Sequence, residues 1–202
     1  MLKLHSSTTS PFGRKAKVAA HFTGFSDKMQ VLSADTMDPA DPLRKDNPLG
    51  KIPCLVLEDG SSLYDSRVIV EYFDHEAGGG RIFPKEWKAR LATLKMQALA
   101  DGIIDAAILK LYEGRFRSQE KHEPAWIAHQ SGKVERGLAV LEANPPVASA
   151  SPDIGVIAVA CMLEWYEFRF QGLSSGQYPR LSAFVKDFNE KVPVFAKTKP
   201  HA

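Results

Sequence analysis

The stretch NPLGKIPCLVLEDGSSLYDSRVIVEYFD, residues 47–74, contains most of the signals that decide the fold of the first part of the chain. The apolar run at 54–57 predicts a strand, and Asp59-Gly60 is a strong hairpin signal, so residues 62–64 are expected to return antiparallel. Apolar residues then recur at helical spacing, at Val68, Ile69, Tyr72 and Phe73. The stretch therefore predicts a β-hairpin followed by an amphipathic helix.

The residues before this stretch predict a strand, a helix and a second strand. Leu2-Lys3-Leu4 alternates like a short strand, Pro11 suits the first position of a helix that Gly24 would end, and residues 29–32 form a second apolar strand. A right-handed crossover would pair these two strands in parallel. Residues 1–76 are thus expected to form an α/β domain of βαβ-ββα order with a mixed four-stranded sheet.

The strand signals stop after the linker Ala77-Gly78-Gly79-Gly80. The remaining chain shows helical apolar patterns at 85–117, at 123–141, from Asp153 to about Phe170, from Pro179 and from Pro193. We therefore expect a linker at 77–85 and an all-helical domain at 86–202.

Composition limits the possible partners of the chain. A net charge of +2 is too small to predict nucleic-acid or membrane-surface binding, although the residues after 76 hold 17 basic and 13 acidic side chains, which at most hints at tolerance of anionic ligands. The apolar run 154–163 is too short to span a bilayer, and the N-terminus lacks the apolar segment of a signal peptide. Cys54 and Cys161 lie in apolar segments, so we expect two buried thiols and a cytoplasmic protein.

The sequence SPFGRK, residues 10–15, joins the first strand to the first helix, where α/β folds often bind ligands. Ser10 could simply cap the helix, or its hydroxyl could act with the helix dipole to stabilise an anion. The basic residues Arg14, Lys15 and Lys17 are too few for nucleic-acid binding and are expected on a solvated helix face.

Three further positions could offer polar groups to a small ligand. A cis Ile52-Pro53 bond would present the Ile52 backbone to an extended peptide, although a trans proline starting the strand is the commoner case. Asp65 and Ser66 could merely cap the third helix, or could bind an ammonium and a carboxylate respectively. Lys51 adds a positive charge beside them.

The helical half offers few catalytic signals of its own. Asp101 and Asp105 lie four residues apart and are interpreted as a solvated or interface-facing stripe, because no histidine motif accompanies them as a metal site would require. The aromatic residues are expected in the core or at an interface: Tyr112, Trp126, Trp165, Tyr166 and Phe168.

Taken together, the motifs resemble the cytosolic glutathione transferase family. They are SPFGRK at 10–15, NPLGKIP at 47–53 and LYDSRVIVEY at 63–72, in this order and followed by a linker and a helical half. The resemblance covers the whole chain and is greatest for bacterial serine-type members, and ALADGI at 98–103 is similar to a YibF-like subgroup. It implies a thioredoxin-like first domain and a homodimer.

The resemblance also implies residue roles. Ser10 would hydrogen-bond the sulfur of glutathione, a co-substrate rather than a metal-dependent cofactor, and Ser7 is a possible substitute for it. Ile52, before a cis Pro53, would pair with the cysteinyl backbone, while Asp65 and Ser66 would hold the γ-glutamyl group. Lys51 would reach the carboxylate end of the tripeptide. Asp101 would approach the ligand across a dimer cleft.

The expected activity is transfer of glutathione to a small, mostly apolar electrophile in a pocket around Tyr112, Phe116 and Trp165. Two alternatives stay open: a glutathione-dependent peroxidase or dehalogenase using the same site, and a non-catalytic binding module of the same fold. Thiol exchange through Ser10 is excluded, because a serine cannot form a mixed disulfide.

Overall fold

The computed structural model describes residues 1–201, and its first part is built on a four-stranded sheet of order β2-β1-β3-β4. The strands are β1 (Leu2–Ser6), β2 (Met29–Ser33), β3 (Cys54–Val56) and β4 (Ser62–Leu63). β1 pairs in parallel with β2, from Leu2 opposite Met29 to Ser6 opposite Ser33. β3 is antiparallel to both of its neighbours. The predicted mixed sheet is confirmed.

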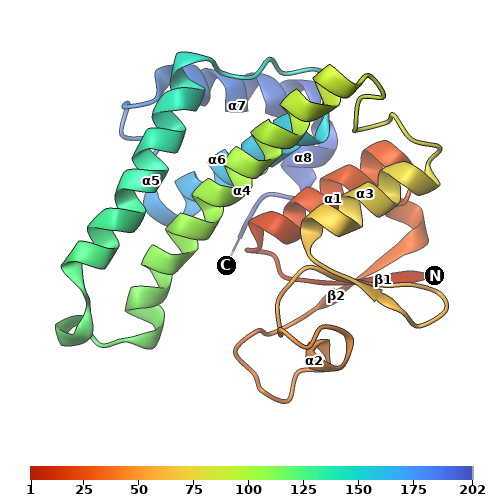
Figure 1. The fold of residues 1–202 in the computed structure, drawn as a ribbon, viewed down its shortest axis with the longest axis horizontal. Coiled ribbons are helices and arrows are strands. Elements are labelled where there is room, and N and C mark those ends of the chain that lie inside the picture. The colour runs from red at the N-terminus through yellow and green to blue at the C-terminus, as the bar shows by residue number, and fades with distance from the viewer. Residues whose placement is uncertain (202) are drawn as a thin grey trace.

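Two helices, α1 (Pro11–Thr23) and α3 (Ser66–Glu76), cover one face of this sheet, while the one-turn α2 (Leu43–Asp46) lies on the other side (Figure 1). Gly24 ends α1 in the left-handed conformation, with φ of 78°, and its N–H bonds the α1 carbonyls of Ala20 and His21. Leu4, Leu55 and Phe73 are fully buried between the sheet and the helices. Of the apolar positions predicted for α3, Ile69 and Phe73 face the core and Tyr72 is half-buried, whereas Val68 is 46% exposed.

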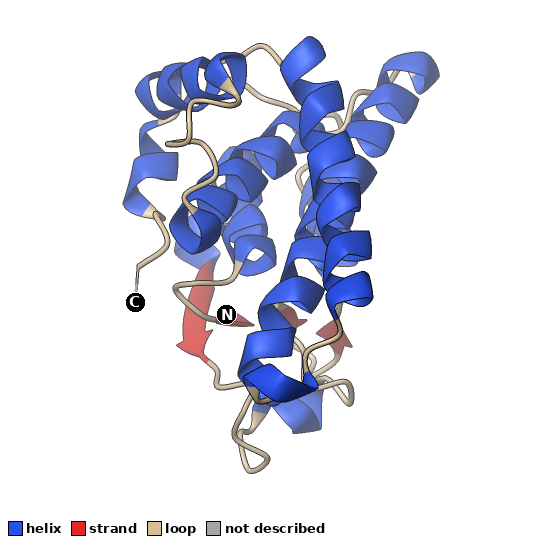
Figure 2. Cartoon of the chain, turned by 90° about the vertical axis from the view of Figure 1, so that its left-hand side faces the viewer, coloured by secondary structure: helices blue, strands red, loops and turns tan. Residues whose placement is uncertain are grey.

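The second part of the chain consists of helices, which pack on the α1 and α3 side of the sheet (Figures 1 and 2). They are α4 (Trp87–Phe116), α5 (Pro124–Ala143), α6 (Ile154–Phe170), α7 (Pro179–Lys191) and α8 (Pro193–Lys197), with 3-10 turns at Ser26–Lys28 and Gln119–Lys121. Every residue of α6 from Ile154 to Trp165 is buried, because α6 packs against α1, α4 and α7. Within residues 1–201, no helix combines the length and apolar composition that a bilayer crossing requires.

The segment between the two parts is ordered by one buried carboxylate. Asp74 accepts hydrogen bonds from the backbone N–H groups of Gly80, Arg81 and Ile82 at 2.8–3.0 Å. The Ile82 carbonyl then accepts from the Ile154 N–H at 2.9 Å, which ties the linker to the start of α6. The boundaries expected at 76 and 86 remain predictions, and Ala202 lies outside the described residues.

The start of α6 is held by Asp153, which is the N-cap residue of the helix. Its side chain accepts from the Val156 N–H at 2.9 Å and from the Thr93 hydroxyl of α4, also at 2.9 Å. A Cβ atom on Gly155 would lie 2.8 Å from the Thr93 carbonyl oxygen, so the two helices approach closely here. Asp153 thus caps one helix and anchors it to its main neighbour.

We expect Asp153→Ala to lower the free energy of unfolding by about 1–2 kcal/mol, because Val156 and Thr93 both lose their acceptor. Urea denaturation followed by tryptophan fluorescence measures this change. Asp153→Asn is the matched control, because its amide oxygen still accepts a hydrogen bond, and it should lose less than half as much. An equal loss in both variants would contradict the capping explanation.

Candidate functional site

Ser10 lies at the N-cap of α1, where the chain leaves β1. Its Oγ accepts a hydrogen bond from the Gly13 N–H at 3.0 Å, and Pro11 occupies the first helical turn. Capping uses only an acceptor site of the hydroxyl, so the hydroxyl hydrogen remains available to donate to a ligand. The two interpretations of Ser10 are therefore compatible: the same side chain can cap the helix and bind an anion.

The serine and threonine residues before Ser10 are fixed partly by local contacts. The Ser7 hydroxyl lies 3.5 Å from that of Thr9, and the Thr8 hydroxyl donates to the His201 carbonyl at 2.9 Å. Ser7 lines the same cleft as Ser10. Ser7 therefore remains a possible substitute for Ser10, although it is not a helix cap.

A cleft of about 610 Å³ lies between this loop and the helical part. One wall is formed by Ser7, Ser10, Lys51 and Ile52, and the other by residues of α4 and α6, including Tyr112, Phe116 and Trp165. Tyr112 and Phe116 meet edge to face, with ring centroids 5.1 Å apart. The structure thus places an aromatic wall across the cleft from Ser10, and the binding of a second substrate to this wall stays a prediction.

The aromatic residues that were predicted to lie in the core or at an interface differ in their exposure. Trp165 is buried, whereas Tyr112 and Trp126 are 37% and 41% exposed. Tyr166 and Phe168 are half-buried, and Tyr166 packs against Phe170. Tyr112 and Trp165 both line the cleft, and an interface role for the exposed aromatic residues stays a prediction.

The loop before β3 presents Ile52 at the cleft. The Ile52-Pro53 peptide bond is cis, as the resemblance implied, with Ile52 half-buried and Pro53 buried. Asn47, only 1% exposed, holds the loop: its amide nitrogen donates to the Lys51 carbonyl at 2.7 Å, and its oxygen accepts from the Leu49 N–H at 3.0 Å. Within residues 1–201 the Ile52 backbone N–H and carbonyl make no hydrogen bond, so both are available to a peptide ligand.

Asp65 and Ser66 form the start of α3, and Asp65 caps it by accepting from the Arg67 N–H at 2.9 Å. Asp65 is exposed and Ser66 is buried. Neither residue, nor Pro53, lines the cleft that contains Ser10. The structure therefore brings Ser10, Lys51 and Ile52 together at the cleft, and Asp65 lies near enough to the cleft residue Asp105 for their charges to interact.

Asp101 contradicts the expectation of a solvated or interface-facing stripe. Its carboxylate is fully buried and receives the Lys15 ammonium at 2.7 Å on both oxygens, with Arg67 Nε at 3.1 Å from one of them. Burial lowers the pKa of Lys15, and the charge of Asp101 counters this effect. Asp105, in contrast, is exposed and lines the cleft. Asp101 thus joins α1, α3 and α4 rather than facing solvent.

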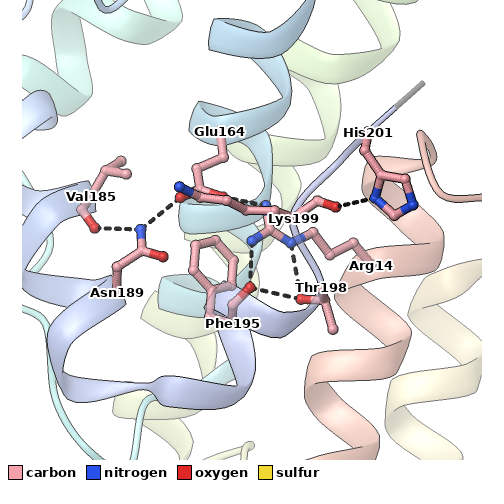
Figure 3. Close-up of polar contacts among 8 residues, drawn as sticks. All are labelled: Arg14, Glu164, Val185, Asn189, Phe195, Thr198, Lys199 and His201. Carbon is pink, nitrogen blue, oxygen red and sulfur yellow. Dashed lines mark hydrogen bonds and ion pairs between the residues drawn. The ribbon is translucent and has the colours of Figure 1, made fainter.

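The prediction of a solvated basic face on α1 is also wrong for Arg14 and Lys15, which are 2% and 1% exposed. Arg14 lies 2.7 Å from Glu164 of α6, donates to the Phe195 carbonyl at 2.8 Å and to the Thr198 hydroxyl at 3.1 Å, and stacks on the Phe195 ring (Figure 3). Only Lys17 is partly exposed. The face is buried because the helical part packs over it.

Spacing in the sequence could have revealed this burial. Lys15 falls three residues before Val18 and seven before Phe22, so it lies on the apolar side of the helix. Burying a lysine requires a paired acid, and Asp101 shares a face with Leu94 and Ala98. A buried charge on an apolar helix face therefore predicts an opposite charge on the facing helix.

The two cysteines are buried and free, as expected. Burial raises the pKa of the Cys54 thiol and of the Cys161 thiol to about 11, so both stay protonated near neutral pH. Within residues 1–201, no three His, Cys, Asp or Glu side chains gather in a way that could hold a metal ion. The polar groups that line the cleft include the hydroxyls of Ser7 and Ser10, the Lys51 ammonium, the Asp105 carboxylate and the Ile52 backbone. Two guanidinium groups, those of Arg115 and Arg169, also line it.

Comparison with known proteins decides the family. Residues 9–76 match the model of the glutathione S-transferase N-terminal domain. An uncharacterised GST-like protein of Escherichia coli (strain K12), YibF, is 30% identical over 171 residues, which are 83% of each chain. The chain belongs to the glutathione transferase family.

Solved structures of this family match the whole chain. A glutathione S-transferase of Methylobacillus flagellatus KT with glutathione bound is 39% identical, with full coverage of both chains and a TM-score of 0.90. A glutathione transferase family member of Pseudomonas fluorescens Pf-5 with bound glutathione is 38% identical, with full coverage and a TM-score of 0.89. The latter has also been solved with S-(propanoic acid)-glutathione. These matches confirm the thioredoxin-like first domain and the helical second domain of this transferase-family chain.

The Lys15–Asp101 pair gives a stability prediction. Lys15→Met should lower the free energy of unfolding by about 3–5 kcal/mol, because it leaves a fully buried carboxylate with Arg67 alone. The double variant Lys15→Met/Asp101→Leu should recover most of that loss, because both charges are then removed from the core. Chemical denaturation of each variant measures the coupling.

Lys17→Met is the matched control, because Lys17 is half-buried on the same helix and makes no ion pair within residues 1–201. It should change the free energy of unfolding by less than about 1 kcal/mol. A loss for Lys15→Met as small as that of Lys17→Met would show that the buried pair does not hold the helices together.

Proposed function

We propose that this chain is a glutathione transferase in which Ser10 and the N-terminus of α1 keep the thiol of bound glutathione as its thiolate. The thiolate attacks an electrophilic, mostly apolar second substrate. One observation carries the proposal: Ser10 lines the cleft at the N-cap of α1, with its hydroxyl hydrogen free and an aromatic wall opposite. The glutathione-bound relatives support the choice of tripeptide.

The available interactions are large enough for this chemistry. A thiol of ordinary pKa near 8.5 is only about 3% thiolate at pH 7, and lowering the pKa to about 6.5 requires ~2.7 kcal/mol. A hydrogen bond to a charged acceptor contributes about 1.5–3 kcal/mol, and a helix N-terminus about 0.3–1 kcal/mol. Ser10 and α1 are therefore sufficient without a metal ion or a separate general base.

The proposed reaction is a displacement or an addition at carbon. The thiol proton passes to solvent, and the sulfur lone pair forms the new carbon–sulfur bond. In a displacement, the leaving group departs with the electron pair of the broken bond. The S-substituted glutathione held by the Pseudomonas fluorescens relative supports a product of this kind.

The remaining glutathione contacts are proposed from the motifs and the local geometry. The free N–H and carbonyl of Ile52 would pair with the cysteinyl backbone in the manner of an added strand. The exposed carboxylate of Asp65 would bind the γ-glutamyl ammonium, the Ser66 hydroxyl its carboxylate, and Lys51 the glycine carboxylate. Pro53 sets the orientation of the Ile52 carbonyl.

We also propose a homodimer, because apolar side chains are exposed near the start of α3 and α4. Val68, Trp87 and Leu91 are 46–66% exposed, and an ion pair of 2.6 Å between Arg90 and Glu71 joins these two helices. A second copy of the chain would bury this surface. Light scattering after size-exclusion chromatography measures the oligomeric state.

Ser10→Ala is expected to lower turnover of 1-chloro-2,4-dinitrobenzene at pH 6.5 by at least tenfold, because the thiol of bound glutathione loses a donor. Turnover should recover as the pH rises above about 8.5, where the thiol ionises without help. The dissociation constant for glutathione should change less than about twofold. A pH–rate profile and calorimetry measure the two quantities.

Two variants control for the loss of the helix cap. Ser10→Thr keeps a hydroxyl at the N-cap and should retain most of the activity, while Ser7→Ala removes the neighbouring hydroxyl and should change little. Unchanged turnover in Ser10→Ala, or a loss in Ser7→Ala instead, would remove Ser10 from the mechanism. Retention on a glutathione resin without turnover of electrophiles or hydroperoxides would favour the non-catalytic module.

Asp65→Asn tests the γ-glutamyl site while keeping an oxygen that can cap α3. We expect glutathione to bind at least tenfold more weakly, because an ammonium loses its carboxylate partner. Glutathione without its α-amino group should bind wild type and variant equally, since it has no ammonium to lose. Equal weakening for both ligands would contradict a direct contact between Asp65 and the ammonium.

A further inference from the structure

Two arginines line the cleft opposite the Ser10 loop, Arg115 in the last turn of α4 and Arg169 in the last turn of α6. Within residues 1–201, neither guanidinium makes a hydrogen bond or an ion pair. Arg169 is half-buried, and its Nε is fully buried without a partner. A buried donor without a partner is costly, so a group that supplies an acceptor there would be bound favourably.

Within residues 1–201, Arg169 has a second cation, Arg115, nearby and forms no ion pair. Burial lowers the pKa of Arg169, and the charge of Arg115 lowers it further. Among residues 1–201, the acid that lines the cleft is Asp105, whose charge interacts instead with those of Asp101, Arg67, Lys51 and Asp65. The arginine side of the cleft is therefore positive, and the acid of the cleft does not neutralise it.

The helix dipole explains only in part why these two arginines lie at the C-terminal ends of α4 and α6. A cation in the last turn of a helix gains about 0.3–1 kcal/mol from the helix dipole, but the gain requires neither burial nor a position at a cleft. Arg117, at the end of α4, shows the alternative: it is exposed and pairs with Glu113 at 3.1 Å. In the part of the chain that the structure describes, the two cleft arginines have no such acidic partner.

The arginines stand beside the aromatic wall. Arg115 lies 5.4 Å from the centroid of the Tyr112 ring, and Arg169 follows Trp165 by one helical turn. Tyr112 and Trp165 both line the cleft. An apolar ligand body on the aromatic rings would thus carry a negatively charged group within reach of a guanidinium fork, which matches the geometry of a carboxylate.

We propose that the second substrate is an apolar or aromatic electrophile that carries a carboxylate, bound by Arg115 and Arg169. This inference rests on the proposed glutathione transferase function and specifies its substrate class. The electrophilic carbon would face the Ser10 loop, and the carboxylate would lie at the ends of α4 and α6. With 4-chloro-3-nitrobenzoate as the substrate, the glutathione sulfur forms a bond to the ring carbon that bears chlorine. Chloride then leaves with the electron pair of the carbon–chlorine bond.

The test compares 4-chloro-3-nitrobenzoate with 4-chloro-3-nitrobenzamide, which differ in charge but little in shape. For each compound, kcat/KM is divided by the rate constant of the uncatalysed reaction with glutathione, which removes the difference in intrinsic reactivity. Wild type should prefer the benzoate, and Arg115→Gln/Arg169→Gln should lose this preference by roughly tenfold or more. Arg117→Gln is the matched control, because Arg117 does not line the cleft, and should keep the preference.

A binding measurement makes the test independent of catalysis. Calorimetry gives the dissociation constants of S-(4-carboxybenzyl)glutathione and S-benzylglutathione for the same three proteins. Wild type and Arg117→Gln should bind the carboxybenzyl conjugate more tightly, and the double variant should bind the two conjugates about equally. If wild type binds the conjugates but turns over neither the benzoate nor the benzamide, the transferase proposal fails. The ratio of the affinities for the two conjugates still decides the role of the arginines.

Two results would overturn the inference. One is an unchanged preference for the carboxylate in the double variant, in turnover and in binding. The other is that the double variant binds S-benzylglutathione more weakly than wild type does, but binds γ-glutamyl-S-benzylcysteine, which lacks the glycine, as tightly as wild type does. The second result would assign the arginines to the glycine carboxylate of glutathione itself.

Discussion

Two consecutive basic residues of α1 meet buried acids of two different helices, and the position of the candidate site depends on these contacts. Lys15 pairs with Asp101 of α4, and Arg14 with Glu164 of α6. Because a buried charge is costly without its partner, both pairs restrict how α1 can shift or rotate relative to the helical part. Ser10 lies at the N-terminus of the same helix, so the pairs also fix its hydroxyl relative to the aromatic wall of the cleft. Arg67 extends the restraint to α3, whose first residues are the proposed γ-glutamyl site.

The elements of the fold were largely predictable because their signals are local. Asp59-Gly60, Gly24 and Pro11 specify turns and helix ends through backbone geometry alone, and apolar spacing specifies which face is buried. The candidate cleft was predictable only in outline. Tyr112, Phe116 and Trp165 were placed opposite Ser10 by resemblance, whereas the contact between Lys15 and Asp101 spans 86 positions and has no local signal. Treating charged residues as solvated by default was the source of both errors on α1 and α4.

The role of Arg115 and Arg169 was likewise not predictable from the sequence alone. A net positive charge in the second part of the chain was visible in the sequence, but the sequence does not tell which cations lack a partner. That property depends on how the ends of α4 and α6 meet, and on the position of Asp105, whose charge interacts with those of Arg67 and Lys51. The cleft thus combines three features: a helix N-terminus with a free hydroxyl hydrogen, an aromatic wall, and two guanidinium groups that have no hydrogen-bond or ion-pair partner among residues 1–201.

The central claim is that Ser10 and the N-terminus of α1 stabilise the thiolate of bound glutathione. The most direct measurement is an ultraviolet titration of the wild-type complex, in which the absorbance of the thiolate near 240 nm is followed against pH. The account predicts a pKa of about 6.5 for the bound thiol, roughly two units below that of a free thiol. A bound thiol that titrates at about 8.5 or above would contradict it.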